Sequence, residues 1–189
     1  MTSFPRHKII GAACLAGFVA CVWLSNFLLT TFGVIDLPLL GAVPAGVFTA
    51  GLAFSMRDAV QSHLGRAWVF LGVAVGAALS FALSQAVVTP DGFVIASAMK
   101  VAIASAIAFS ISELVDYGIY TPLRKRNLPA AVGLSNTVGA LFDSVIFLSL
   151  AFGSLNFLQG QVAAKILVTL PVVGALAWRQ HRTRAILLG

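Results

Sequence analysis

The chain has 189 residues, of which 59% are hydrophobic and 10% are charged, whereas soluble domains carry about 25% charged residues. Six acidic and twelve basic side chains are too few to cover the surface of a water-soluble globule, and the mean hydropathy is +0.98. These values exclude a soluble enzyme, a disordered chain and a disulfide-rich scaffold. They predict an integral membrane protein.

Six apolar stretches lie between the charged clusters, and each is long enough to cross a bilayer as a helix. In chain order they are residues 9–31, 38–55, 67–88, 92–117, 128–151 and 158–178. The connections between them are too short to hold a further domain. We therefore predict an all-α integral membrane protein whose single domain, residues 1–189, is a bundle of six transmembrane helices.

The first two stretches each allow a second interpretation. Arg6 and Lys8 precede the first stretch, as in a signal peptide, but its 23 residues exceed a signal-peptide apolar core of about 7–15. We therefore interpret it as a retained span. In the second stretch Pro38, Pro44 and Gly46 interrupt the apolar run, which is typical either of a kinked helix or of backbone that lines a cavity.

The basic residues are segregated along the chain. Ten of the twelve Lys and Arg residues fall in four places that lie on one side of the membrane if there are six spans: Arg6 and Lys8, Arg57 and Arg66, Arg124 to Arg126, and Arg179, Arg182 and Arg184. The opposite connections contain no Lys or Arg. The positive-inside rule then places both termini in the cytoplasm. Cations beside span ends meet lipid head groups, so we expect the lipid bilayer as a partner and no nucleic acid.

Several charged and amide side chains lie within the predicted spans, where a charge costs at least about 2.5 kcal/mol. Glu113 and Asp116 share a face of the fourth span, and Asn136, Asp143 and Phe147 share a face of the fifth. Further polar residues within or at the edges of the spans are Asn26, Gln85, Lys100, Gln161 and Lys165. The set indicates a solute-binding cavity inside the bundle.

The candidate substrate-binding residues are Asn26, Glu113, Asp116, Asn136, Asp143, Phe147, Gln161 and Lys165. A structural interpretation stays open beside the functional one, because a pair such as Asp143 with Lys165 can simply fasten two helices. Lys100, near the outer interface, can extend its ammonium group to water.

Enzyme signatures are weak in this sequence. His7, His63 and His181 all lie outside the predicted hydrocarbon region, so an intramembrane Ser–His pair or histidine metal site cannot form. The remaining catalytic option pairs Asp116 with Asp143 as an intramembrane aspartyl protease, but the sequence around neither residue matches such enzymes. We therefore expect a protein that is not an enzyme and has no catalytic residue, metal or cofactor.

Several motifs in order resemble the vitamin uptake transporter family, also called the queuosine precursor transporter family. The resemblance covers about residues 22–165. Its motifs are Ser25-Asn26, Pro44-Ala45-Gly46, Arg57-Asp58 with Gly65, Ala104-Ser105 through Ser112-Glu113 to Asp116-Tyr117, Arg124 to Arg126, Ser135-Asn136, and Phe142-Asp143-Ser144-Val145-Ile146-Phe147. Ser62 stands where the family's loop has a glutamate, and Leu64 where it has a tyrosine.

This resemblance implies a multi-pass importer of the bacterial cytoplasmic (inner) membrane that carries a 7-deazaguanine base, a precursor of queuosine, by secondary transport. The implied fold is the six-helix fold of the substrate-binding subunits of energy-coupling-factor transporters. A carboxylate can accept both hydrogen bonds from the paired N–H groups of such a base, while amides address its carbonyl edge. Asp143 or Glu113 would be the carboxylate. Candidate amides are Asn26, Asn136 and Gln161, and candidate stacking rings are Trp23, Phe27 and Phe147.

Two alternatives remain open at this point. The chain can be a vitamin-binding subunit that needs a separate ATPase, with the row of Ala12, Ala16 and Ala20 as its docking face. It can also be a membrane scaffold that does not transport, in which the buried polar residues serve assembly alone. We expect a stand-alone transporter of a vitamin-like heterocycle, without a partner ATPase.

Overall fold

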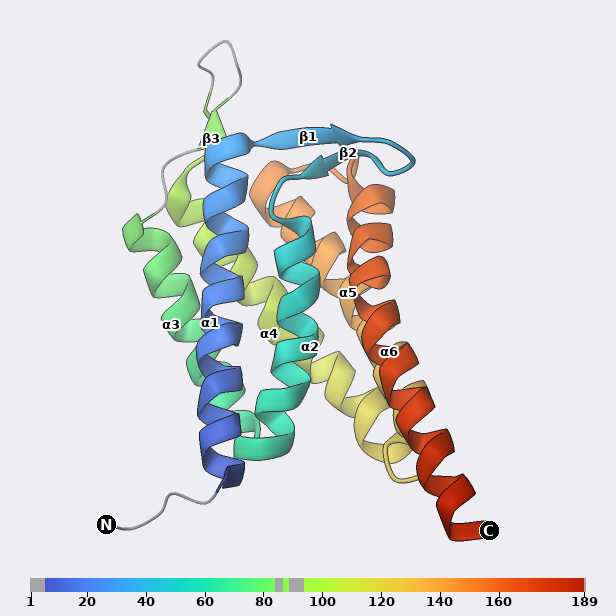
Figure 1. Ribbon diagram of the computed structural model, residues 1–189. Helices are drawn as coiled ribbons and strands as arrows, with labels where there is room; N and C mark the ends of the chain where they lie inside the picture. The colour runs from blue at the N-terminus through green and yellow to red at the C-terminus, as the bar shows by residue number, and fades with distance from the viewer. Residues whose placement is uncertain (1–5, 84–86, 89–93, 189) are drawn as a thin grey trace, which may run out of the picture.

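The computed structural model describes the backbone of residues 6–83, 87–88 and 94–188, and the side-chain surroundings of residues 6–82 and 96–182. Six helices make up most of these residues, and two short β-hairpins lie at one end of the bundle (Figure 1). The elements are α1 (Arg6–Phe32), β1 (Val34–Leu37), β2 (Gly41–Pro44), α2 (Val47–Leu64), α3 (Arg66–Leu83), β3 (Val87–Val88), β4 (Val94–Ala96), α4 (Ala98–Leu123), α5 (Leu128–Phe152) and α6 (Leu158–Leu188). Gln85 lies outside the described residues.

Four helices, α1, α4, α5 and α6, are long and apolar enough to cross a membrane, and α3 is a shorter apolar helix. Large apolar side chains are exposed on the outer surface of the bundle, for example Phe70 of α3, Ile103 of α4 and Leu167 of α6. An exposed apolar surface of this extent suits contact with lipid. The chain is therefore a multi-pass helical membrane protein.

The second helix begins later than the sequence predicted. Residues 38–44 do not continue a helix but form the turn and second strand of a hairpin, with Val34 paired to Pro44 and Leu37 to Gly41. Leu39 and Gly41 have left-handed backbone angles, φ 73° and 68°, which a helix cannot contain. As a result α2 runs from Val47 to Leu64 rather than over residues 38–55.

The shift of α2 corrects the assignment of Arg57 as a loop cation, because Arg57 lies inside the helix and is fully buried. The fourth helix is displaced in the same direction. Residues 94–96 form β4, Ser97 caps α4 by accepting a hydrogen bond from the Lys100 backbone N–H, and the helix continues to Leu123.

Close backbone approaches hold α1 against α2 and α3. A Cβ atom on Gly46 would lie 1.9 Å from the Ser25 carbonyl oxygen, and the Ser25 hydroxyl donates to the Gly46 carbonyl at 3.0 Å. Gly72 and Gly76 of α3 similarly leave room for Phe18 and Val22 of α1. Gly72 and Gly76 therefore serve helix packing inside the chain.

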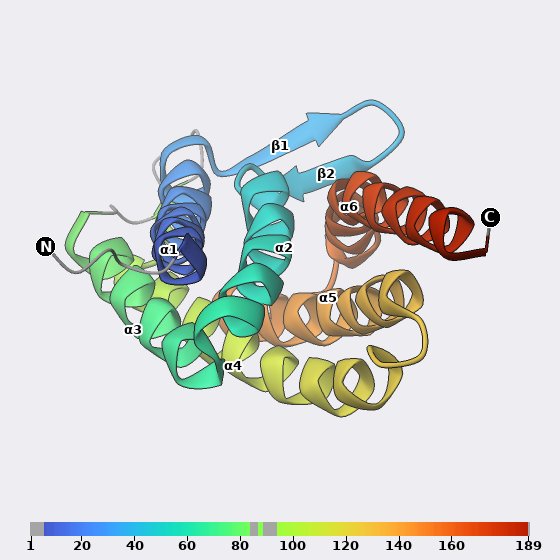
Figure 2. The same ribbon diagram turned by 60° about the horizontal axis from the view of Figure 1, so that its bottom comes forward.

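When the bottom of Figure 1 is turned toward the viewer, α2 lies between α1 and α6 (Figure 2). In Figure 1, α4 and α5 lie behind these helices. The N-terminal end of α1 and the C-terminal end of α6 lie at the same end of the bundle, and the β1–β2 hairpin covers the opposite end (Figure 1).

We predict that the end holding both termini faces the cytoplasm. Reporter fusions after Arg126, between α4 and α5, and after Leu155, between α5 and α6, should report opposite sides of the membrane, with Arg126 inside. The activity of a cytoplasm-specific and a periplasm-specific reporter at both positions measures this. The same side for both fusions would contradict six spans.

Candidate functional site

A small cavity lies within the bundle, lined by residues of α1, α2, α4, α5 and α6. The lining residues are Val22, Ser25, Asn26, Ala50, Ala53, Ser105, Phe109, Asp143, Phe147, Gln161 and Lys165. Five of the eight candidate substrate-binding residues, namely Asn26, Asp143, Phe147, Gln161 and Lys165, are in this set. Its volume is about 30 Å³, which is room for water-sized molecules. A ligand larger than a few water molecules requires these side chains to separate.

An ion pair between α5 and α6 forms the charged wall of the cavity. The Lys165 Nζ donates to Asp143 Oδ2 and, at 2.9 Å, to the Ser144 hydroxyl. Lys165 is 1% exposed and Asp143 is 7% exposed. Within the described part of the chain, Asp143 Oδ1 accepts no hydrogen bond, and each carboxylate oxygen has two acceptor positions. The carboxylate therefore keeps acceptor capacity for a ligand while paired with Lys165.

Two amide side chains line the same cavity, and they differ in their hydrogen bonding. Asn26 Nδ2 donates to the Ser80 hydroxyl of α3 at 3.0 Å, and that hydroxyl donates to the Gly76 carbonyl, so the amide is held in one orientation. Gln161 is 3% exposed, and its Oε1 accepts no hydrogen bond among the described residues. A buried acceptor without a donor is costly, so Gln161 has an acceptor available to a ligand donor.

The aromatic lining differs in part from the expected set. Phe147 and Phe109 line the cavity. Trp23 and Phe27 instead stack on each other at 5.4 Å between ring centroids, and Trp23 lines an apolar groove between α1 and α3. Those two rings are therefore outside the cavity that contains Asp143.

The other three candidates, Glu113, Asp116 and Asn136, belong to a separate buried cluster around Arg57. Arg57 Nη2 lies 2.7 Å from Asp58 Oδ1 and 2.8 Å from Asp116 Oδ1, and Nε lies 3.1 Å from Glu113 Oε2. Arg57 Nη2 also donates to Asn136 Oδ1 at 2.8 Å, and Asn136 Nδ2 donates to Asp58 Oδ2 at 3.2 Å. This cluster joins α2, α4 and α5.

Phe54 lies between the two charged groups. Its ring centroid is 5.1 Å from the Arg57 guanidinium carbon and 5.8 Å from Lys165 Nζ, and the ring stacks on Phe109 at 5.0 Å. Phe54 is 1% exposed. The ring therefore separates the cavity at Asp143 from the Arg57 cluster with an apolar partition.

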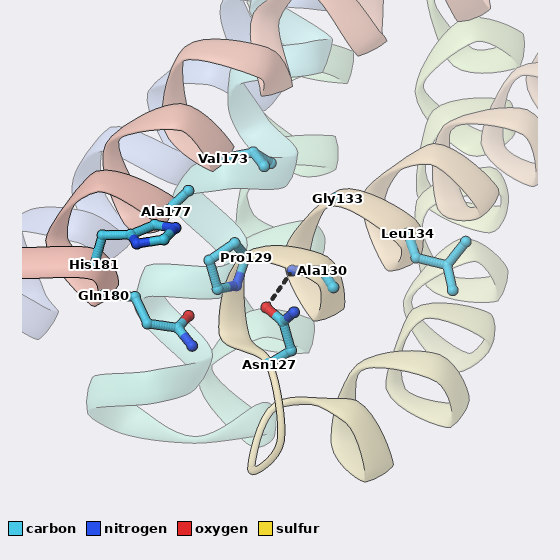
Figure 3. A pocket seen from close by; sticks show the side chains of 9 residues that line it. All are labelled: Asn127, Pro129, Ala130, Gly133, Leu134, Val173, Ala177, Gln180 and His181. Carbon is cyan, nitrogen blue, oxygen red and sulfur yellow. Dashed lines mark hydrogen bonds between the residues drawn. The ribbon is translucent and has the colours of Figure 1, made fainter. Parts of the chain in front are cut away.

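Further pockets open near the end of the bundle that holds the termini. One, of about 310 Å³, is lined by Ser55, Asp58, His63, Tyr120 and Arg179 among others, so it reaches the Arg57 cluster at Asp58. Another lies between the start of α5 and the end of α6, where Asn127 and Pro129 face Gln180 and His181 (Figure 3). Its Asn127 Oδ1 is already occupied as the cap of α5, accepting from the Ala130 N–H.

Fold and site together define a class: a multi-pass helical membrane protein with a polar, charge-paired cavity inside the bundle. A family model described as "putative vitamin uptake transporter" matches residues 44–178, well over half of the chain. The chain belongs to the vitamin uptake transporter family. Comparison with curated proteins and with solved structures finds no match.

Sequence reasoning missed two features of the site. Ser105 lies in a family-like motif and Phe109 carries no charge, and neither is among the candidate binding residues, but the packing of α4 brings both to the cavity. The apolar pattern predicts a loop at Arg57, although Phe54, Arg57 and Asp58 have the spacing of one helical face. Extending the second helix beyond residue 55 would have placed Arg57 among the buried charges.

We predict a non-additive response at the Asp143–Lys165 pair. Asp143→Asn and Lys165→Met should each lower thermal stability, because each leaves one buried partner without its counter-charge. The double variant should recover part of that loss, with a coupling of about 0.5–3 kcal/mol, yet remain without uptake. Thermal unfolding and uptake of the four proteins measure both effects. A double variant with full uptake would show that the pair is structural only.

Proposed function

We propose that the chain imports a 7-deazaguanine base, a precursor of queuosine, across a bacterial cytoplasmic membrane by secondary transport. The observation that supports this most is the cavity in which Asp143, Gln161, Asn26 and two phenylalanine rings face one space. Membership of a vitamin uptake transporter family supports a vitamin-like small molecule as the cargo.

The chemistry of the cavity suits a flat heterocycle with adjacent donors. The ring N–H and exocyclic amine of a guanine-like base donate side by side, and Asp143 can accept both through its remaining lone pairs. The unpartnered Gln161 Oε1 accepts one further donor. Phe109 and Phe147 offer apolar faces to the ring.

The Lys165 ammonium can contact the ligand as well as pair with Asp143. When a base binds to Asp143, Lys165 keeps the carboxylate ionised and can donate to a carbonyl oxygen of the base through its third N–H. A neutral, planar ligand thus meets one anionic and one cationic group on the same wall. This arrangement favours a base that carries both donors and a carbonyl, such as a deazaguanine, over a purely apolar vitamin.

The experiment is uptake by the purified chain alone in proteoliposomes, with a radiolabelled 7-deazaguanine base. We expect saturable uptake that excess unlabelled base abolishes and that empty liposomes lack. Cells unable to synthesise queuosine provide the second measurement, because uptake should restore queuosine in their transfer RNA. The proposal would be overturned if neither the proteoliposomes nor the cells showed saturable uptake.

One observation favours a second candidate, the vitamin-binding subunit of an energy-coupling-factor transporter. Ala12, Ala16 and Ala20 line an apolar groove of about 590 Å³ between α1 and α3, and small residues let another helix approach closely. Such a subunit needs an ATPase and a scaffold protein. Uptake by the purified chain alone therefore excludes this candidate, whereas ligand binding without uptake and a co-purifying ATPase would support it.

A further inference from the structure

A pocket with room for a small molecule lies between α2, α4, α5 and α6, near the end of the bundle that holds the termini. Its volume is about 310 Å³, and small-molecule sites have volumes of about 300–1,000 Å³. The cavity at Asp143 has about 30 Å³. We call the larger space the Asp58 pocket, after the carboxylate in its wall. In this structure the Asp58 pocket, and not the cavity, has room for a ligand the size of a base.

The cavity and the Asp58 pocket occupy successive levels of the same helices. In α2 the cavity residues end at Ala53, and the pocket residues begin at Ser55. In α5, which runs in the opposite direction, the pocket residues end at Val132 and the cavity residues begin at Asp143. The lining residues of α6 follow the same order as those of α2. The pocket therefore lies between the cavity and the end of the bundle that holds the termini.

The Phe54 ring separates the two spaces. It packs over Gly139 of α5, where a Cβ atom would lie 3.6 Å from Phe54 Cε1. Gly139 lies in the sequence between Val132 of the pocket and Asp143 of the cavity. A ligand that passes directly from the cavity to the pocket therefore requires a movement of this one ring.

The Asp58 pocket repeats the chemistry of the cavity. Each space has a carboxylate that is paired with a buried cation, Asp58 with Arg57 in the pocket and Asp143 with Lys165 in the cavity. Each also has a serine and an aromatic ring in its wall. These are Ser55 and Tyr120 in the pocket, and Ser105 and Phe147 in the cavity. A ligand that suits one set of groups therefore suits the other.

Two groups of the pocket wall keep hydrogen-bonding capacity for a ligand. Asp58 Oδ1 accepts two hydrogen bonds from Arg57, whereas Oδ2 accepts one, from Asn136 at 3.2 Å, and so keeps an acceptor position. The Ser55 hydroxyl is buried and has no hydrogen-bond partner among the described residues. Arg179 also lines the pocket, but it already has an interaction of its own, so we assign it no role in binding. A ligand in the pocket can therefore bind Asp58 and Ser55 without breaking an existing hydrogen bond.

We propose that the Asp58 pocket is a second binding site for the transported base, which occupies it after leaving the cavity and before release at the end of the bundle that holds the termini. The proposal rests on the transport function proposed above. The ligand class is a planar, uncharged heterocycle with adjacent N–H donors. One N–H donates to Asp58 Oδ2, a second polar group of the base pairs with the Ser55 hydroxyl, and the Tyr120 ring supplies an apolar face.

Thiol labelling of purified protein in lipid nanodiscs tests whether the base occupies the pocket. Ser62 is exposed in the pocket wall, so a maleimide should label Ser62→Cys in a protein whose Cys14 and Cys21 are replaced by alanine. A 7-deazaguanine base at about ten times its dissociation constant should slow this labelling about tenfold, because about nine-tenths of the pockets are then occupied. Ala130→Cys is the matched control. Ala130 is exposed but lines the separate pocket of Figure 3, so its labelling should not change.

Three outcomes of the labelling decide where the ligand lies. Protection of Ser62→Cys should persist when Asp143→Asn disables the cavity, and its disappearance would show that the base occupies the cavity alone. Labelling that the base does not slow, in a protein that takes up the base, would overturn the pocket while leaving the transport function standing. Protection in a wild-type protein without uptake would support the site and overturn the transport function.

Filling the pocket tests its place on the transport path. Ala59 lines the pocket, so Ala59→Phe puts a ring into this space, whereas Ala130→Phe puts the same ring outside it. We expect Ala59→Phe to keep binding of the base at the cavity but to lose most uptake, and Ala130→Phe to keep both. Equilibrium binding, thermal unfolding and initial uptake rates of the two purified variants measure this. Full uptake by Ala59→Phe would show that release bypasses the pocket and would overturn the proposal.

Discussion

Replacing Arg57 with glutamine should destabilise the protein by about 3–5 kcal/mol, since breaking a buried ion pair leaves its partners uncompensated. Here the stranded groups are Asp58, Glu113 and Asp116, of which the last two are fully buried. In a chain of this size the thermal midpoint should fall by roughly 10 °C or more. Thermal unfolding of the purified protein in detergent measures the loss.

Arg126→Gln is the matched control, because it removes the same charge from an exposed position after α4 and should change the midpoint little. A second variant tests the cause. Arg57→Gln combined with Asp116→Asn removes one stranded charge and should recover part of the stability. Equal stability of Arg57→Gln and wild type would show that the carboxylates are already neutral without the arginine.

Asp143→Asn should remove most of the uptake while the protein still inserts. Asparagine keeps one oxygen that can accept from Lys165, but it replaces the other acceptor with a donor amide that opposes the paired N–H groups of a guanine-like base. A buried polar group facing the wrong partner costs about 1–3 kcal/mol, which corresponds to a loss of about 5- to 150-fold in affinity. Initial uptake rates at limiting substrate, normalised to the amount of inserted protein, measure it.

Two further variants test whether the loss of uptake is specific to the carboxylate at position 143. Asp143→Glu keeps the charge and both acceptors, so it should fail less completely. Asp36→Asn removes an exposed carboxylate of β1 and should leave uptake unchanged. Normal uptake by Asp143→Asn would show that this carboxylate is not a ligand. If the loss of uptake were fully accounted for by a loss of inserted protein, the result would instead support a scaffold role.

The composition and the spacing of charged residues were enough to predict a helical membrane protein, because hydrocarbon excludes unpaired charges from long stretches of chain. The same cost argument singled out Asp143 and Lys165, and the structure places them in one ion pair. Motif order indicated the family that the chain belongs to. Each of these inferences depends on the local sequence or on the general cost of placing a charge in hydrocarbon. None of them requires knowing which helices are neighbours.

The division of the polar residues into two groups was decided by tertiary structure. Asn136 and Asp143 share a face of α5, seven residues apart, yet Asn136 joins the Arg57 cluster and Asp143 the cavity. What separates them is the Phe54 ring on α2, whose depth depends on where that helix begins. Because Leu39 and Gly41 adopt left-handed backbone angles in a turn, α2 begins later in the chain. An apolar run in the sequence does not reveal that turn. Helix periodicity fixes which residues share a face, whereas the neighbour that each face meets depends on packing between segments far apart in the chain.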